Sequence, residues 1–202
     1  MSRIIAGARR GMRITMPPTD KTRPTSDRVR EALFSAVTSW AGTTGEATEE
    51  SLRGLSFCDL YAGSGAVGLE AASRGAAPVM LVEANRRTAV TATRNVTELD
   101  LAARVHVGRV EQLVSQPCES GFDLVFADPP YDLSSATIEA LLTRILAQGW
   151  VARDGLVVVE RPRRGGELGW PDGFESPWSR RYGETLLHFG QVAGAVETPG
   201  EP

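Results

Sequence analysis

The sequence predicts an α/β fold with a mostly parallel central sheet, and three observations lead to it. Short apolar runs without alternating polar residues recur along the chain, which is typical of strands covered on both faces. Helical stretches separate these runs, an order that favours parallel strands joined by right-handed crossovers. Near the end of the chain, two strand-like segments flank a two-residue turn and predict an antiparallel hairpin. With 202 residues, 42% of them hydrophobic, the chain is long enough for one full-sized domain.

The first long element is an amphipathic helix that begins after Thr25-Ser26-Asp27, where several side chains can cap a helix. Apolar residues then recur at helical spacing and define one core-facing side. The helix is predicted to end at Ala41-Gly42, and a polar loop over residues 42–51 follows. The residues on the core-facing side are Val29, Ala32, Leu33, Ala36, Val37 and Trp40.

Apolar runs after this loop form the expected sheet. The clearest intervening helix has an apolar face from Ile138 to Leu146, a cap at Ser134 or Ser135 and a stop at Gly149. The C-terminal hairpin is predicted to turn at Gly183-Glu184, with glycine first. The predicted strands are Leu55–Leu60, Val79–Val82, Val105–Val107, Phe122–Ala127 and Leu156–Glu160, followed by the hairpin strands Trp178–Tyr182 and Thr185–Phe189.

Charge is distributed unevenly along the chain, although the net charge is only -3. The first 30 residues hold eight Arg and Lys against two Asp, whereas the other 172 residues hold 14 basic and 23 acidic side chains. A basic end on an acidic body predicts contact with a polyanion at one place, and a solvated tail is the alternative. Two short strands, at Ile4–Gly7 and Gly11–Ile14, favour an ordered segment over a tail.

The chain is expected to divide into a basic N-terminal extension with a short hairpin (residues 1–24), a main domain (25–190) and a disordered tail rich in Gly, Pro and Glu (191–202). No apolar stretch approaches the roughly 20 residues that cross a bilayer, and the first residues lack the apolar core of a secretory signal. A cytoplasmic protein without a membrane partner is therefore expected. Cys58 and Cys118 have no metal-type spacing, so no metal site is expected.

The first chemical motif is a glycine-rich loop, Gly63-x-Gly65-x-x-Gly68, where a strand ends and a helix begins. Its glycines let the backbone turn tightly and approach a ligand, and the N–H groups at the start of the helix suit a carboxylate or a phosphate. Glu83 ends the next strand, 20 residues after Gly63, where it can accept hydrogen bonds from ribose hydroxyls. A nucleoside-containing cofactor is predicted, and a dinucleotide fits as well. Asp59, just before the loop, is predicted to hold either a cationic cofactor or the loop itself.

The second motif, Asp128-Pro129-Pro130-Tyr131, follows the apolar run Phe122–Ala127 directly. It therefore lies at the carboxyl end of a buried strand, where open α/β sheets bind substrates, and beside the glycine loop. The prolines fix the backbone so that the Asp128 carboxylate and the Pro129 carbonyl, both acceptors only, point into one small volume. Two converging acceptors suit an exocyclic NH2 group, whose lone pair they orient for attack. Tyr131 adds a face on which a flat base can stack.

Together the two motifs resemble those of the Rossmann-like, doubly wound methyltransferases that use S-adenosylmethionine to modify exocyclic or amide nitrogens. The resemblance implies that the glycine loop holds the methionine part of S-adenosylmethionine, Glu83 the ribose and Asp128–Tyr131 the target amine. Many relatives place an acid after the third strand to meet the adenine amine, whereas this chain has Gly108-Arg109, so backbone groups of Arg109 and Val110 are expected to serve instead. The cofactor-binding candidates are Asp59, Tyr61, Ala62, Gly63, Ser64, Gly65, Gly68, Glu83, Ala84, Arg109 and Val110, and the catalytic candidates are Asp128, Pro129, Pro130 and Tyr131.

The N-terminal segments Arg3-Ile4-Ile5-Ala6-Gly7, Arg23-Pro24-Thr25 and Asp27–Phe34 are similar to the start of the RsmD-type methyltransferases, and the similarity extends from about Arg3 to Phe189. That family methylates N2 of one guanine in bacterial 16S ribosomal RNA. The resemblance implies a 16S rRNA substrate, within a small ribosomal subunit or an assembly intermediate, and RNA contact by the N-terminal segment. The candidates for phosphate contacts are Arg10, Arg13, Arg23, Arg28 and Arg30.

Other functions stay open from the residues alone. A motif that binds an amine does not identify its ring, so adenine N6, cytosine N4 or a protein glutamine are alternative targets. A non-catalytic RNA-binding assembly factor would need the basic end but not Asp128. A nicotinamide oxidoreductase would use the glycine loop but has no evident use for Asp128-Pro129-Pro130-Tyr131.

Overall fold

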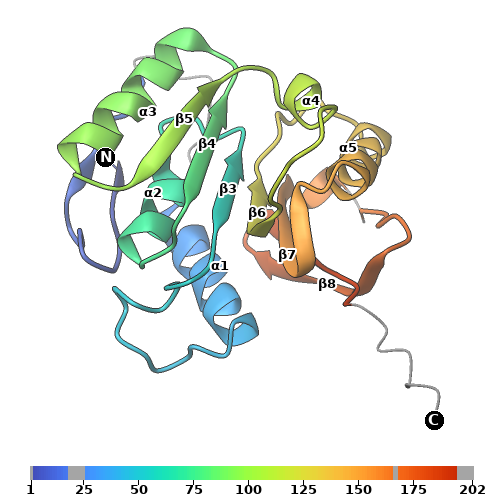
Figure 1. Ribbon diagram of the computed structural model, residues 1–202, viewed down its shortest axis with the longest axis horizontal. Helices are drawn as coiled ribbons and strands as arrows, with labels where there is room; N and C mark the ends of the chain where they lie inside the picture. Colours follow the sequence, from blue (N-terminus) through green and yellow to red (C-terminus); the bar gives the residue numbers. More distant parts are fainter. Residues whose placement is uncertain (1, 18–25, 166–167, 195–202) are drawn as a thin grey trace.

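The computed structural model describes residues 2–17, 26–165 and 168–194. Within these ranges, a seven-stranded sheet with the order β5-β4-β3-β6-β7-β9-β8 forms the centre of the molecule (Figure 1). The strands of this sheet are β3 (Phe57–Leu60), β4 (Val79–Glu83), β5 (Ala103–Val107), β6 (Phe122–Ala127), β7 (Val151–Pro162), β8 (Phe174–Tyr182) and β9 (Thr185–Val192). The helices are α1 (Asp27–Trp40), α2 (Ala66–Ser73), α3 (Arg86–Glu98), α4 (Val110–Leu113) and α5 (Ser135–Ala147), with a 3-10 turn at Arg163–Gly165.

The sheet is parallel from β5 to β7, and β9 and β8 complete it in antiparallel orientation. This confirms the predicted α/β class, with its C-terminal hairpin. Gly183 has a φ of +62°, the left-handed conformation that a turn with glycine first requires. The parallel register brings the ends of β3, β4 and β6 nearly level, because Leu60 of β3 is opposite Val82 of β4 and Ala127 of β6.

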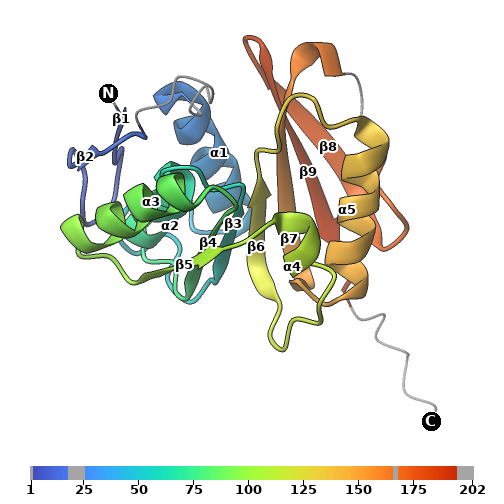
Figure 2. The same ribbon diagram turned by 90° about the horizontal axis from the view of Figure 1, so that it is seen from above.

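Helices cover both faces of the sheet at its centre, so β3 and β6 are almost entirely buried, whereas the edge strands β5 and β8 have exposed residues (Figure 2). Helices α1, α2 and α3 pack on one face, where Leu33, Leu69 and Ala92 join one hydrophobic core. Helices α4 and α5 pack on the other face, where Val110 and Ile145 join a second core. The predicted apolar stripe of α1 is buried in the first core at Val29, Leu33, Ala36 and Val37.

Strand boundaries differ from the prediction mainly at the C-terminal edge. Strand β7 begins at Val151, before the predicted run, because its first residue pairs with Phe122 of β6. Strand β9 continues to Val192, where it pairs with Phe174 of β8. The predicted tail over residues 191–202 was therefore wrong at its first two positions, and residues 195–202 lie outside the described part of the chain.

The N-terminal extension packs tightly on the domain. Strands β1 (Ser2–Arg3) and β2 (Arg13–Ile14) pair in antiparallel orientation, so a hairpin forms as predicted. Its first strand lies at Ser2–Arg3 and not at the predicted Ile4–Gly7. Ile4 and Ile14 are buried in the first core. Beside them, both carboxylate oxygens of Glu70 in α2 accept backbone N–H groups, from Ile5 at 2.7 Å and from Ala6 at 2.9 Å. Residues 2–17 of the extension therefore form an ordered layer over α2.

Glycine is required where the extension crosses α2. A Cβ atom on Gly7 would lie 1.9 Å from the carbonyl oxygen of Ser73, and the φ of Gly7 is +82°. The neighbouring Ala8 N–H donates to that same Ser73 oxygen at 2.7 Å. The close approach holds the exposed Arg10 and Arg13 on a rigid support.

Candidate active site

The glycine loop joins β3 to α2 at the carboxyl end of the sheet and contains three residues in the left-handed region. Tyr61, Gly63 and Gly65 have φ values of +64°, +57° and +85°, and Gly65 is the N-cap of α2. Because a capping side chain is absent at Gly65, the N–H groups at the start of α2 face the loop directly. Gly68 serves packing instead, since a Cβ atom there would lie 2.2 Å from the Leu81 side chain.

Asp59, in β3 just before this loop, holds the loop through a hydrogen bond. It is 1% exposed, and its Oδ2 accepts the Gly68 N–H at 2.8 Å. Burial raises the pKa of Asp59 from its ordinary 3.8 to about 7; the Gly68 bond opposes this and the charge of Glu83 adds to it. Asp59 was predicted to hold either a cationic cofactor or the loop itself. Its hydrogen bond to Gly68 shows that it holds the loop.

Glu83, at the end of β4, accepts a hydrogen bond from the glycine loop. Its Oε2 accepts the Gly63 N–H at 2.9 Å, and its Oε1 accepts the Asn85 N–H at 2.7 Å. Asn85 in turn caps α3 by accepting from the N–H groups of Arg87 and Thr88. The Glu83 carboxylate therefore joins the glycine loop to the next loop of the sheet, beside the exposed Ala84.

Glu111 is a site residue that sequence reasoning missed. The Tyr61 hydroxyl donates to Glu111 Oε1 at 2.8 Å, and Arg109 Nε lies 3.5 Å from Glu111 Oε2. Burial alone would raise the pKa of Glu111, but hydrogen bonds from a backbone N–H and Tyr61, with the charge of Arg109, lower it overall. An acid in the first turn of α4, two positions after Arg109, was the available signal.

The Asp128–Tyr131 loop follows β6 and lies next to the glycine loop. Strands β3 and β6, which lead into the two loops, pair directly, and the Asp128 N–H lies 3.5 Å from the Leu60 carbonyl oxygen. Burial raises the pKa of Asp128 well above its ordinary range; the charges of Glu160 and Asp59 add to the effect and Arg161 opposes it. Tyr131, by contrast, is 54% exposed. The arrangement combines a half-buried acid with an accessible aromatic ring.

Arg161 of β7 fastens this loop, which the sequence did not indicate. Its Nη2 donates to the Leu133 carbonyl oxygen at 2.7 Å and its Nη1 to the Pro130 carbonyl oxygen at 3.4 Å. The side chain is nearly buried, and burial lowers the pKa of Arg161 while the charge of Asp128 raises it. Arg161 therefore both positions the Asp128 loop and partly compensates its negative charge.

The arginines predicted to contact RNA differ in their exposure to solvent. Arg10, Arg13 and Arg28 are exposed, and Arg23 lies outside the described residues. Arg9 binds the end of α3 instead, with its Nε donating to the Leu99 carbonyl oxygen at 2.6 Å.

Arg30 is a correction to the prediction, because it is 0% exposed and cannot reach RNA. Its Nη1 donates to Ser2 Oγ at 3.2 Å, its Nη2 donates to Asp27 Oδ1 at 3.0 Å, and its Nε lies 3.8 Å from Glu70 Oε2. Burying a charged group is unfavourable unless it is paired, and these partners supply the pairing. Arg30 therefore anchors the N-terminal extension to α1 and α2.

No group of three or more His, Cys, Asp and Glu side chains in the described ranges is placed to hold a metal ion. None of the described helices is both long enough and apolar enough to cross a bilayer.

Comparison with known proteins identifies the family. The model of the family Conserved hypothetical protein 95 matches residues 2–191. This chain belongs to that family. Ribosomal RNA small subunit methyltransferase D of Escherichia coli K12 is 32% identical over 195 residues, which cover 96% of this chain and 86% of that protein. Membership of the RsmD family, expected from the N-terminal segments, is thus confirmed.

Solved structures share the fold of this chain. A hypothetical protein of Thermus thermophilus has a TM-score of 0.75 and 33% identity, covering 96% of this chain and 99% of that chain. The 16S rRNA N2 methyltransferase RsmC of T. thermophilus, in complex with AdoMet and guanosine, has a TM-score of 0.60 at 19% identity, covering 87% of this chain and 44% of that one. The latter likeness establishes a common fold.

Proposed function

We propose that this chain transfers a methyl group from S-adenosylmethionine to the exocyclic N2 amine of a guanine in 16S rRNA of the small ribosomal subunit. The observation that carries the proposal is the position of Asp128 and Pro129 directly beside the glycine loop, in a member of the RsmD family. The relative named ribosomal RNA small subunit methyltransferase D supports the substrate. A cytoplasmic location follows from the proposed ribosomal substrate.

The residues around the glycine loop fit S-adenosylmethionine better than a dinucleotide. Carboxylates surround the loop, with Asp59 below it, Glu83 at one side and Glu111 bonded to Tyr61. A sulfonium and an ammonium group are attracted by the negative charges of Glu83 and Glu111, whereas a pyrophosphate is repelled by them. Asp59 also takes the Gly68 N–H near the start of α2, which reduces the donors left for a phosphate. Glu83 is the candidate for the ribose, and Arg109, Val110 and Glu111 are the candidates for the adenine.

The chain's own residues supply orientation and proton acceptance. When bound, S-adenosylmethionine supplies an electrophilic methyl group on a sulfonium leaving group, so a strong base is not needed before attack. The Asp128 carboxylate and the Pro129 carbonyl accept the two N–H bonds of the amine and direct its lone pair. The raised pKa of Asp128 makes its ionised form a stronger base, suited to hold the proton that the nitrogen releases as its bond to carbon forms.

The target base must reach this loop from outside a helix, because an amine inside a duplex is not accessible. Tyr131, more than half exposed, offers the incoming base a stacking surface. The exposed Arg10, Arg13 and Arg28 are candidates for phosphate contacts on either side of the target. Residues 1–24 are in this proposal the RNA-contacting extension of the methyltransferase domain.

The test supplies labelled S-adenosylmethionine with small ribosomal subunits, free 16S rRNA, DNA and a protein extract, and then digests the RNA to nucleosides. N2-methylguanosine in the ribosomal RNA is the expected product. Label confined to DNA or protein, or recovered as N6-methyladenosine or N4-methylcytidine, would overturn the guanine assignment. RNA binding without transfer to any of these substrates would indicate a non-catalytic assembly factor.

A further inference from the structure

A pocket of about 220 Å³ adjoins the Asp128–Tyr131 loop, and two of the residues that line it, Arg28 and Tyr131, are candidates for RNA contact in the function proposed above. It lies between the start of α1, Tyr131 and the turn between β8 and β9. Arg28 and Ser26 line it from the helix, and Tyr182 and Glu184 line it from the hairpin. Asp128 and Pro129 do not line this pocket, which is therefore distinct from the place of the target amine.

The size of the pocket suits one nucleotide. Pockets for drug-sized ligands measure about 300–1,000 Å³, so this one is too small for a dinucleotide or a whole cofactor. It is open to solvent on the side of Arg28 and Glu184, which are both exposed. A single base can therefore enter while its sugar and phosphates stay outside with the rest of an RNA strand.

The side chains that line the pocket match the chemistry of a nucleotide. Two tyrosine rings, Tyr131 and Tyr182, provide flat surfaces, and base stacking on aromatic rings is the main source of affinity for single-stranded RNA. The Arg28 guanidinium donates hydrogen bonds to phosphate or to the acceptor edge of a base. The Glu184 carboxylate only accepts, so it favours a base with an amino group, such as cytosine, over uracil.

Tyr131 links this pocket to the target site. It follows Asp128 by three residues and also lines the pocket, so it is positioned to contact both the target base and its neighbour in the strand. Tyr182 is part of the hairpin at the sheet edge, where its ring also packs against the first core and is thereby held in place. A neighbouring base stacked here would hold the strand open and keep the target base extruded toward Asp128.

We propose that the pocket formed by Arg28, Tyr131, Tyr182 and Glu184 binds the nucleotide adjacent to the target guanine in a single-stranded segment of the RNA. This inference rests on the proposed function, since it assigns a second subsite to the same RNA substrate. It makes the hairpin turn at Gly183-Glu184 a determinant of substrate recognition.

The test measures steady-state methylation of small ribosomal subunits by Tyr182→Ala, Tyr182→Phe and Glu184→Gln. For Tyr182→Ala we expect KM for the subunit to rise about tenfold, the loss of one stacked base, while kcat and the affinity for S-adenosylmethionine stay within about twofold. Tyr182→Phe keeps the ring and should retain the wild-type KM. An unchanged KM in both Tyr182→Ala and Glu184→Gln would overturn the proposal, and so would an equal loss in Tyr182→Phe and Tyr182→Ala.

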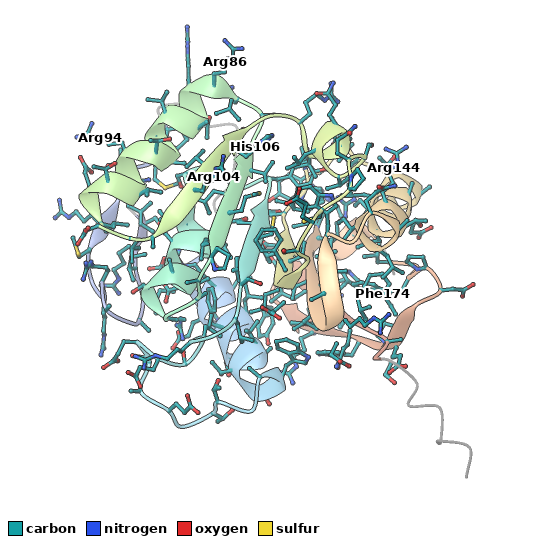
Figure 3. The ribbon with its side chains drawn as sticks, in the orientation of Figure 1. Arg86, Arg94, Arg104, His106, Arg144 and Phe174 are labelled. Atoms are coloured by element: carbon teal, nitrogen blue, oxygen red, sulfur yellow. The ribbon has the colours of Figure 1, made fainter. Side chains whose placement is uncertain are left out.

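Arg28→Ala has a matched control in Arg144→Ala, which removes the same charge from α5 on the opposite face of the sheet (Figure 3). Only Arg28→Ala should raise KM. In subunits whose nucleotide flanking the target is changed to uracil, the wild type and Glu184→Gln should have the same KM. A difference in KM that persists with uracil on either side of the target contradicts the role of Glu184.

A second measurement separates this inference from the proposed function. Filter binding of 16S rRNA does not require methyl transfer, so it reports on the pocket even if the chain methylates another base. Weaker binding by Tyr182→Ala, with unchanged binding by Arg144→Ala, supports the subsite. Equal binding by the wild type and Tyr182→Ala contradicts it, whatever the outcome of the labelling experiment.

Discussion

The glycine loop and the Asp128–Tyr131 loop lie at neighbouring strand ends but are stabilised in different ways. The glycine loop is bonded to carboxylates on its own side of the sheet, because Asp59 accepts from Gly68 and Glu83 accepts from Gly63. Its geometry is thereby complete before any ligand arrives. A small cofactor benefits from such preorganisation, because ordering the loop costs nothing at the moment of binding.

The Asp128–Tyr131 loop is held from the opposite side by one residue of the next strand. Arg161 donates to two carbonyl oxygens of the segment, at Pro130 and Leu133, while Tyr131 stays exposed. This leaves one face of the loop open to a macromolecule. The glycine loop is thus held by carboxylates of β3 and β4, whereas the Asp128–Tyr131 loop is held by an arginine of β7.

The largest expected effect is on the pH dependence of stability and comes from Asp59, beside the glycine loop. An unfolded Asp59 ionises near pH 3.8, whereas the folded one keeps its proton until about pH 7. The contribution of this group to stability is therefore greatest at low pH and falls as pH rises to about 7, by about 4 kcal/mol at most. Asp59→Asn should remove this part of the pH dependence, measured as the difference in free energy of unfolding between variant and wild type at pH 4 and pH 8. Parallel pH profiles would contradict the assignment.

On the target side, Asp128→Ala should reduce kcat for methylation about 10²-fold, because the amine loses one of its two orienting acceptors. The affinity for S-adenosylmethionine, measured by calorimetry, should not change. Asp132→Ala removes an exposed acid from the same segment and should retain activity. A matching loss in Asp132→Ala would mean that the charge of the segment matters and not the position of Asp128.

Arg161→Ala tests whether support from behind the loop is needed, and kcat should fall about tenfold to thirtyfold as the segment loses two hydrogen bonds. Since the Arg161 charge lowers the pKa of Asp128, its removal should also move the acid limb of the pH–rate profile to higher pH. The exposed neighbour Arg163→Ala is the control. A fall in kcat without a shift of the acid limb would restrict Arg161 to packing.

Glu83→Gln should have the smallest effect. A glutamine side chain can accept only one of the two N–H groups that Glu83 now accepts, from Gly63 and Asn85. We expect the dissociation constant for S-adenosylmethionine to rise about tenfold, with a smaller change in kcat. Glu175→Gln changes an exposed glutamate on β8 and should bind the cofactor normally. Unchanged cofactor affinity in Glu83→Gln would remove the ribose role.

Much of the active site could be predicted because its signals are local. Apolar runs that end at Leu60, Val82 and Ala127 mark strand ends, and parallel strands bring such ends to one edge of the sheet. The glycine loop and Asp128-Pro129-Pro130-Tyr131 each follow one of these ends. Their closeness therefore follows from the fold class, without knowledge of a single side-chain contact.

Residue partners far apart in sequence could not be predicted in the same way. Glu111 bonds to Tyr61, 50 residues before it, and Arg161 bonds to Leu133, 28 residues before it. For Glu111 the local pattern offers one signal, an acid in the first turn of α4, whereas for Arg161 it offers none. They were missed because the partner that makes their burial favourable belongs to another element.

Arg28 and Arg30 separate the properties that can be read from the chain from those that depend on packing. The basic character of the first 30 residues, the alternation of strands with helices and the two motifs are properties of the chain. The exposure of each arginine is not a property of the chain alone. Arg28 is exposed at the pocket, whereas Arg30 is buried against Ser2 and Glu70. A charge is buried only where partners compensate its lost hydration, and the packing of the N-terminal extension on α2 places those partners beside Arg30 and not beside Arg28.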